Sequence, residues 1–219
     1  MITYDSIKSN ETIKTYIKMA DESLSALGYT EHSFSHVTRV AEIAGYILST
    51  LGYSEHDINN VKIAGYIHDI GNLVNRDDHS QSGAVMAFVI LNELKMPPED
   101  VAIITTAIGN HDEKTGVPVN ALAAALILAD KSDVRRSRVR NRDISTFDIH
   151  DRVNYSVESS KLEISQDRSY ITLHLKIDSN VGSVMDYFEI FMRRMILCRK
   201  AAERLGMKFK LVINEQTLL

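Results

Sequence analysis

The stretch IAGYIHDIGN, residues 63–72, raises the central question of this sequence. Its apolar residues recur at the spacing of a buried helix, yet the run ends in a histidine and an aspartate side by side, His68 and Asp69. A carboxylate without a partner is costly in a low-dielectric environment, so this pair needs a hydrogen-bond network or a cation. The partner must come from other segments of the chain.

Helical periodicity dominates the chain on both sides of this stretch. Apolar spacing and capping signals predict six helices in succession. The predicted ranges are about 10–27, 33–51, 54–71, 80–95, 98–111 and 120 onward, and the last helix is expected to continue past Asp130 into an arginine-rich stretch. The sequence therefore predicts a mainly α-helical body.

The periodicity changes after about residue 150. Leu162 and Ile164, and then the run from Ile171 to Ile177, alternate with polar residues as strands do, and QDRS between them is typical of a hairpin turn. A helix over about 181–205 and a strand over 209–213 follow. We expect a helical domain over 1–150 with a small packed α+β appendage over 151–219, in the order strand-strand-helix-strand.

Composition limits the classes of function. The chain has 219 residues, 44% of them hydrophobic, which is enough for a proper core, and a formal charge of −4, which gives no electrostatic footprint for nucleic acid. One cysteine excludes an internal disulfide framework, and the polar start MITYDSIKSN does not resemble a secretory signal. The apolar run at 121–129 is about half of the roughly 20 residues that span a bilayer. We expect a cytoplasmic protein without a membrane span.

Histidines and aspartates occur at the ends or inside several of the predicted helices. They are His36, His68, Asp69, His79, His111 and Asp130. Helical bundles build metal sites by projecting such side chains inward, and mixed imidazole and carboxylate ligands suit Mn, Fe, Co, Ni or Zn, and less clearly Mg. Six ligands exceed what one ion needs, and Asp69 has two oxygens with which it could bridge two ions about 3.5 to 4 Å apart.

The ordered motifs HDIGN, HSQSGA, NHDE and LADKSD resemble those of the HD-domain superfamily of metal-dependent phosphohydrolases, over roughly residues 30–140. The resemblance implies a first metal held by His36, His68, Asp69 and Asp130. It also implies a second metal held by His79 and His111, with Asp69 shared between the two.

Two departures from the relatives that degrade cyclic-di-GMP are visible. After NHDE the chain continues with KTGVPV and lacks their GYP element, which argues against that substrate. His32 lies four residues before His36, where those relatives often carry a glutamate. On one helix this spacing would put both rings on the same face, so His32 is a candidate auxiliary ligand or outer contact.

The ligand set alone does not separate three kinds of protein. Di-iron oxygenases similar to myo-inositol oxygenase use a comparable series of histidines and aspartates, and a non-catalytic metal and nucleotide sensor would keep the same ligands. Lys131, Arg135 and Arg138 favour hydrolysis, because at i, i+4 and i+7 of a helix they would form one cationic face that can hold phosphate oxygens. We expect a small phosphorylated substrate, with nucleotides among the candidates, and a catalytic role for Asp69 and Lys131.

The remaining residues with reactive side chains are assigned no chemistry. They are Asp112, a loop residue, and His56, His150 and His174, which lack partners at metal-ligand spacing. Cys198 is expected to pack inside the last helix, and Met185, Phe188, Met192 and Met195 are expected in the core. A homodimer face on this helix stays open as an alternative.

Overall fold

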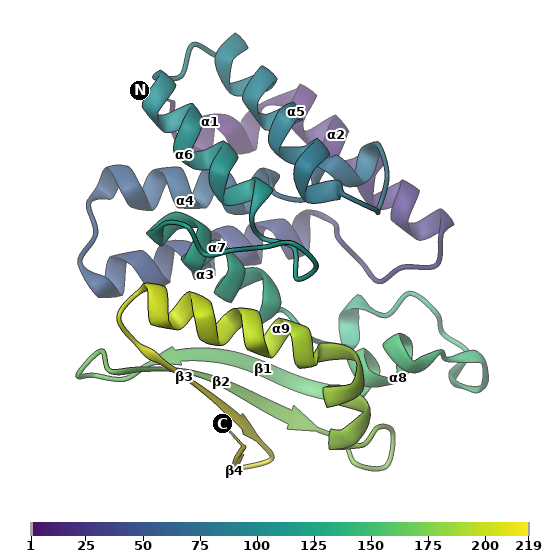
Figure 1. Cartoon of the computed structure of the whole chain (residues 1–219). Helices are drawn as coiled ribbons and strands as arrows, with labels where there is room; N and C mark the ends of the chain where they lie inside the picture. The colour runs from purple at the N-terminus through teal and green to yellow at the C-terminus, as the bar shows by residue number, and fades with distance from the viewer. Residues whose placement is uncertain (1, 219) are drawn as a thin grey trace.

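The computed structural model describes residues 2–218 and has a helical body stacked on a C-terminal layer of sheet and helix (Figure 1). The body consists of α1 (Tyr4–Ser9), α2 (Glu11–Ala26), α3 (Phe34–Leu51), α4 (Glu55–Ile67), the 3-10 turn η1 (Ile70–Leu73), α5 (His79–Glu93), α6 (Pro98–Gly109) and α7 (Ala121–Lys131). The chain then continues through η2 (Arg136–Arg138), η3 (Ile144–Thr146), α8 (Ile149–Ser156), β1 (Val157–Ile164), β2 (Tyr170–Ile177), α9 (Val184–Arg204), β3 (Lys208–Ile213) and β4 (Gln216–Thr217). The predicted fold class, mainly α with a strand-strand-helix-strand appendage, is confirmed.

Helices α3 and α4 approach each other closely at the centre of the body. A Cβ atom at Gly65 of α4 would lie 2.8 Å from the Cα and 2.9 Å from the backbone N of Ala41 in α3, closer than any real contact. Only glycine therefore fits at this crossing. The close approach brings the rings of His36 on α3 and His68 at the end of α4 to a centroid distance of 5.3 Å.

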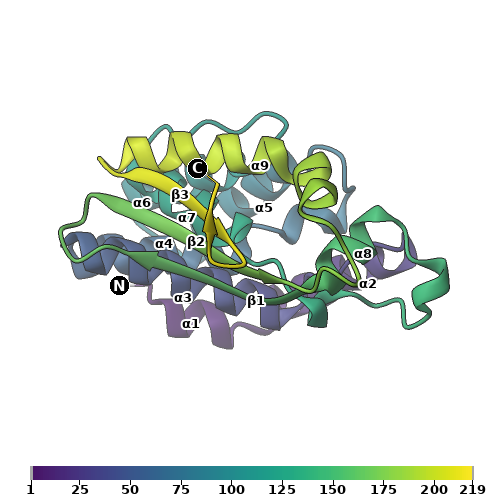
Figure 2. The same ribbon diagram turned by 90° about the horizontal axis from the view of Figure 1, so that it is seen from below.

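The C-terminal layer is a sheet of order β1-β2-β3-β4, in which β2 and β3 run parallel and the other neighbours antiparallel. Helix α9 makes the crossover that two parallel strands require. The alternating apolar residues of β2, from Ile171 to Ile177, are buried on the face that the helices cover, as predicted. Figure 2 shows α9 and the body on that same side of the strands.

The appendage and the body share one hydrophobic core. Buried residues of α7, such as Leu126, and of α9, such as Phe191 and Cys198, belong to one cluster. The layers are also joined by polar contacts, because the Ser160 hydroxyl of β1 donates to the Ser132 carbonyl just after α7, and Arg39 Nη2 of α3 donates to the Ser160 carbonyl at 2.9 Å. The predicted packing of the two parts is confirmed, whereas the boundary near residue 150 stays a prediction.

Two predicted helix boundaries were wrong, and one short helix was not predicted. The predicted helix over 10–27 is preceded by the short α1, which a Thr3 capping box starts, and α4 ends at Ile67 rather than Gly71. Helix α7 ends at Lys131 and does not continue through the arginine-rich stretch. The chain turns there because Asp133 is drawn inward, where its carboxylate accepts from His36 Nδ1 at 2.8 Å.

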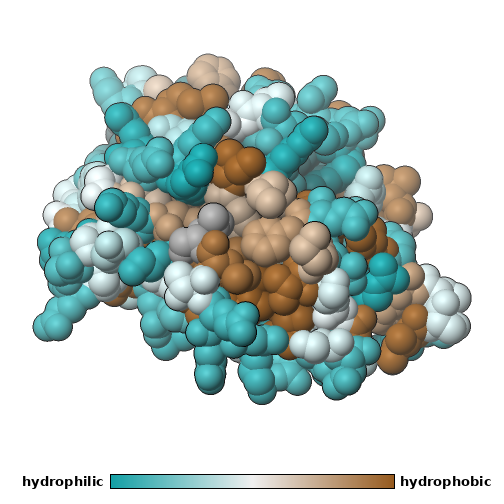
Figure 3. Space-filling view, turned by 60° about the horizontal axis from the view of Figure 1, so that its bottom comes forward, coloured by the Kyte–Doolittle hydropathy of each residue, from teal (hydrophilic) through white to brown (hydrophobic). Residues whose placement is uncertain are grey.

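The prediction that the core contains all four of the large apolar residues Met185, Phe188, Met192 and Met195 of α9 was also wrong. Met195 is buried, but Met185 is 74% and Met192 is 46% exposed. Figure 3 shows apolar side chains gathered in the middle of the face that the C-terminal layer presents, surrounded by hydrophilic ones. A homodimer through α9 stays a prediction.

Within residues 2–218, no helix combines the length and the apolar character needed to cross a bilayer. The run 121–129 lies instead in the buried α7.

Replacing Gly65 by alanine should lower the free energy of unfolding by about 2 kcal/mol, because the added methyl group forces α3 and α4 apart in a well-packed core. Chemical denaturation measures this change. The matched control is Gly109→Ala at the end of α6, where the added Cβ would lie an ordinary 3.5 Å from Ala84 Cβ. Equal stability of the two variants would contradict the close α3–α4 crossing.

Candidate metal centre

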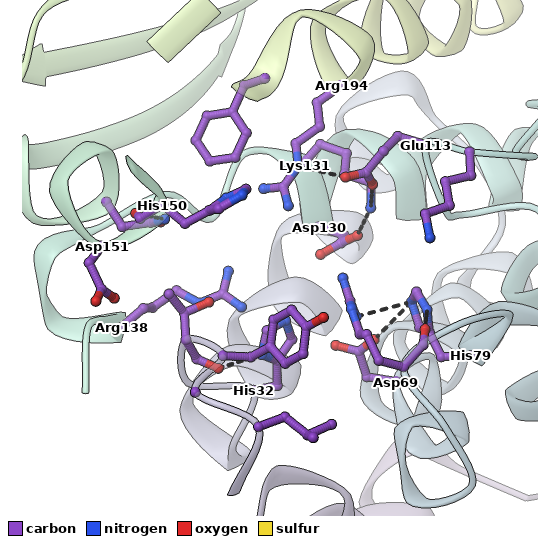
Figure 4. A pocket seen from close by; sticks show the side chains of 18 of the residues that line it. His32, Asp69, His79, Glu113, Asp130, Lys131, Arg138, His150, Asp151 and Arg194 are labelled. Carbon is purple, nitrogen blue, oxygen red and sulfur yellow. Dashed lines mark hydrogen bonds and ion pairs between the residues drawn. The ribbon is translucent and has the colours of Figure 1, made fainter. Parts of the chain in front are cut away.

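The structure brings all six predicted ligands together from segments far apart in the chain. His36 comes from α3, and His68 and Asp69 follow α4. His79 begins α5, and His111 follows the end of α6. Asp130 lies in the last turn of α7, and all six side chains are buried or nearly so. Figure 4 shows Asp69, His79 and Asp130 at the floor of a cavity.

The first part of the cluster consists of two histidines and two aspartates. His36 Nε2 lies 3.4 Å from Asp130 Oδ1 and 3.5 Å from Asp69 Oδ2, and His68 Nε2 lies 3.7 Å and 3.2 Å from the same two oxygens. Both Nε2 atoms are buried without a hydrogen-bond partner anywhere in residues 2–218. These atoms therefore point toward a common centre rather than at one another.

The second part lies on the other side of Asp69. Asp69 Oδ1 is 3.5 Å from His79 Nε2 and 3.9 Å from His111 Nε2, and these two nitrogens are 3.2 Å apart. One carboxylate thus faces two pairs of histidines, Oδ2 toward His36 and His68, and Oδ1 toward His79 and His111.

Hydrogen bonds at Nδ1 fix the tautomers of the four rings. The Nδ1 atoms of His68, His79 and His111 donate to the carbonyls of residues 65, 76 and 108 at 2.8, 3.0 and 2.6 Å, and His36 Nδ1 donates to Asp133. In the neutral rings every Nε2 atom therefore carries a lone pair directed into the cluster. Metal-bound histidines are held in this way, by a donor bond from the second ring nitrogen.

The electrostatics of the cluster favour a positive charge at its centre. Burial opposes charge on His68, but the Asp69 and Asp130 carboxylates raise its pKa to about 10. Burial and the neighbouring positive groups lower the pKa of His111 well below its usual range. The ring is therefore neutral, and its Nε2 lone pair is available to a cation. Despite burial, the facing imidazoles hold the pKa of Asp69 far below its usual range.

This donor set fits divalent metal ions. His36, His68 and Asp130 offer atoms within 4.8 Å of one another, as do His68, Asp69 and His111. Atoms bound about 2.1 Å from one ion lie roughly 3.0 to 3.4 Å apart, close to the observed separations. A cation would also satisfy the two partnerless Nε2 atoms and separate the facing lone pairs of His79 and His111.

A glycine contact holds the two parts of the cluster together. A Cβ atom at Gly71 would lie 2.0 Å from the His79 carbonyl oxygen and 2.4 Å from the backbone N of Gly83. Only glycine allows η1 to pack this closely on the start of α5. The motifs HDIGN and HSQSGA therefore meet through their glycines, which places His79 beside Asp69.

Lys131 is buried beside the cluster, between two carboxylates. Its Nζ lies 2.7 Å from Asp130 Oδ2 and 2.7 Å from Glu113 Oε2, so Asp130 keeps Oδ1 for the histidines. Burial opposes the charge, but Asp130 and Glu113 raise the pKa of Lys131 above its usual range. Glu113 also accepts from Arg194 Nε of α9 at 3.0 Å.

The expected cationic face of Lys131, Arg135 and Arg138 does not exist, because α7 ends at Lys131. Arg135 turns away from the cavity, and its Nε donates to Asp133 Oδ1 at 2.8 Å. Arg138 lines the cavity together with Lys131, but it arrives from the separate turn η2.

His32 lies beside His36 for a different reason than predicted. Helix α3 begins at Phe34 with Ser33 as its cap, so His32 is outside the helix. Its Nδ1 donates to the Thr30 carbonyl at 2.7 Å, and its ring lies edge-to-face on His36 with a centroid distance of 5.3 Å. Burial and then Arg138 lower the pKa of His32 well below its usual range. His32 lines the cavity as a neutral ring, and its role as an auxiliary ligand stays a prediction.

Asp133 is the outer partner that the sequence reasoning missed. Its side chain is fully buried, and it accepts from His36 Nδ1 and Arg135 Nε, both at 2.8 Å, with Arg39 Nε at 3.1 Å. Burial raises its pKa, but His36 and Arg138 together hold the value far below its usual range. The sequence feature that could have identified it is the second aspartate of LADKSD, three residues after Asp130.

The cluster opens into a cavity of about 490 Å³. Its lining carries six carboxylates and five lysine or arginine side chains. His150 of α8, to which the sequence assigned no chemistry, lines the cavity together with Asp151. Neither His56, 2.6 Å from Asp100, nor His174, 3.4 Å from Glu163, takes part in it.

Comparison with known proteins agrees with this geometry. The HD domain family matches residues 33–152, more than half of the chain. The chain belongs to the HD domain family. The match ends before β1, so α9 and the sheet lie outside it.

Two further similarities accompany this match. The chain is 28% identical over 204 residues to an uncharacterized protein of Methanocaldococcus jannaschii, covering 82% of this chain and 77% of that protein. A solved structure of a predicted HD superfamily hydrolase from an uncultured Thermotogales bacterium is 24% identical, with a TM-score of 0.45, over 57% of this chain and 67% of its own.

Replacing Asp133 by asparagine should weaken Mn²⁺ binding about 10- to 100-fold, because His36 loses the anion that fixes its ring and strengthens its Nε2 lone pair. Isothermal titration calorimetry measures the affinity. The matched control is Asp100→Asn, which alters a buried aspartate that pairs with the exposed His56 outside the cluster. Unchanged Mn²⁺ affinity in Asp133→Asn would contradict this assignment.

Proposed function

We propose that this HD domain protein is a metal-dependent phosphohydrolase that hydrolyses a phosphate ester at a binuclear site. The observation that carries the proposal is the position of Asp69, whose two oxygens face different pairs of histidines. A carboxylate placed in this way can join two cations, and paired cations are a common device for displacement at phosphorus.

In this proposal, His36, His68 and Asp130 would hold the first ion, His79 and His111 would hold the second, and Asp69 would be a ligand shared between the two sets. The ions are divalent, from the group Mn, Fe, Co, Ni and Mg. When bound, such a pair supplies Lewis acidity and a water whose pKa is lowered toward neutrality.

The protein's own residues position these groups and set the charge of the cavity. Lys131 holds Asp130 with one oxygen toward the histidines, and its remaining N–H can reach a phosphate oxygen in the cavity that it lines. Because the lining alone is nearly neutral, two divalent ions would make the cavity cationic. An anionic substrate such as a phosphate ester, nucleotides included, suits this charge.

Metal stoichiometry separates the roles of the ligands. We expect about two ions per chain in the wild-type protein and about one in His79→Ala or His111→Ala. We expect none in Asp69→Ala or His68→Ala, because Asp69 faces both pairs of histidines and His68 belongs to both groups of converging donor atoms. Elemental analysis of the purified variants measures this ratio, with His56→Ala as a control that keeps both ions. Full metal content together with full turnover in Asp69→Ala would refute the ligand assignment.

Activity is tested with a panel of phosphatase and phosphodiesterase substrates in Mn, Co, Ni and Mg. We expect metal-dependent release of phosphate or alcohol that chelation abolishes and that Asp69→Ala lowers at least about a hundredfold. Dioxygen consumption with a mixed-valent di-iron signal in electron paramagnetic resonance would instead support an oxygenase. Ligand binding without product release would support a sensor.

A further inference from the structure

Two arginines enter the cavity from outside the ligand cluster. Arg194 comes from α9 and Arg138 from η2, and both line the cavity that opens above Asp69 and Asp130. Figure 4 shows both guanidinium groups pointing into this space. Arg194 lies outside the residues matched by the HD domain family, so here the C-terminal layer contributes a charged side chain to the cavity.

Contacts within the protein hold the guanidinium group of Arg194 in place but leave both of its Nη atoms without a partner among the described residues. Its Nε donates to Glu113 Oε1 at 3.0 Å, and its central carbon lies 4.3 Å from the centroid of the Phe191 ring. These contacts fix the plane of the group. Among the described residues, neither Nη atom of Arg194 has a hydrogen-bond partner, so both remain available to a ligand.

Arg138 has the same property. Its Nε donates to the Glu31 carbonyl at 2.8 Å and its Nη1 to the Asp133 carbonyl at 2.7 Å, while the side chain is only 5% exposed. No partner for Nη2 occurs within residues 2–218. Two neutral carbonyls therefore orient the buried guanidinium group of Arg138. Its Nη2 atom stays free, and Arg138 is a residue of the cavity wall.

Nearby carboxylates do not occupy the free N–H groups of the two arginines. Glu113 is shared between Arg194 and Lys131, and Asp133 is shared among His36 and three arginines. Two more acids of the lining are engaged elsewhere. Asp148 caps α8 by accepting from the Asp151 backbone, and Asp151 accepts from Asn141 at 3.3 Å. Both Nη atoms of Arg194 and Nη2 of Arg138 thus have no carboxylate partner among the described residues.

We propose that Arg194 and Arg138 form a second anion subsite, so that the substrate carries a phosphate or carboxylate group in addition to the phosphate that is hydrolysed. This inference rests on the proposed function of the metal cluster. The free N–H groups hold the second anion by charge-assisted hydrogen bonds. A cavity of about 490 Å³ is in the range of small-molecule sites, so it has room for a sugar bisphosphate, a phosphorylated carboxylic acid or a nucleoside diphosphate.

The first test measures pyrophosphate binding to the chelator-treated, metal-free protein by calorimetry. Arg194→Gln should weaken binding about tenfold or more, because a hydrogen bond to a charged group is lost. The fold is expected to survive, since Glu113 keeps Lys131 as its partner. Arg193→Gln is the matched control, because Arg193 is the exposed neighbour on the same helix and does not line the cavity.

The second test compares turnover within substrate pairs that differ by one anionic group, such as glycerol 3-phosphate and 3-phosphoglycerate, or fructose 6-phosphate and fructose 1,6-bisphosphate. Wild-type kcat/KM should favour the member with two anionic groups. Arg194→Gln and Arg138→Gln should each lower that preference about tenfold.

The outcomes separate the two proposals. No pyrophosphate binding in the metal-free wild-type protein, or equal affinity in wild type, Arg194→Gln and Arg138→Gln, would overturn the subsite. Equal loss of turnover on both members of a pair would also overturn it, because the arginines would then act on the hydrolysed phosphate or on the fold. Arginine-dependent pyrophosphate binding without any hydrolysis would refute only the proposed function and keep the subsite.

Discussion

The structure depends on the convergence of buried imidazole lone pairs and buried carboxylates at two adjoining points. The Nδ1 atoms of four histidines donate hydrogen bonds to protein acceptors. These bonds fix the orientation of each ring and therefore the direction of its Nε2 lone pair. Asp69 stands between the two pairs with one oxygen toward each. Such an arrangement is unfavourable without positive charge, since it places lone pair against lone pair in a region shielded from water. Cations resolve the conflict, and this is why the cluster is best understood as a metal centre.

Much of the surrounding body serves to hold these groups at fixed separations. Gly65 allows α3 and α4 to cross closely, and Gly71 allows η1 to pack on the start of α5. Asp133 and Lys131 occupy the outer side of the cluster, where one orients His36 and the other orients Asp130. The C-terminal layer completes the cavity wall through α8 and α9. The appendage therefore shapes the space in which a substrate would lie, in addition to extending the core.

The sequence predicts the ligand cluster well because its signal is local. Each of the six residues sits at a helix end or inside an apolar run, and the spacing of the motifs resembles that of a known family. The end of α7 could not be found in this way, since no glycine or proline follows Lys131. The helix ends because Asp133 is drawn to His36 and Arg39, which are tertiary partners. Arg194 and His150 were missed for the same reason, because their neighbours in sequence carry no information about a cavity that α5, α7, α8 and α9 line together. Helix α1 was missed because six residues are too few to show a period.

The most direct test of the central claim is anomalous diffraction from crystals grown with Mn²⁺, recorded at the manganese absorption edge. The account predicts two adjacent anomalous peaks, one contacted by His36, His68 and Asp130, the other by His79 and His111, with Asp69 touching both. Crystals with saturating Mn²⁺ and no anomalous peak between these side chains would contradict it.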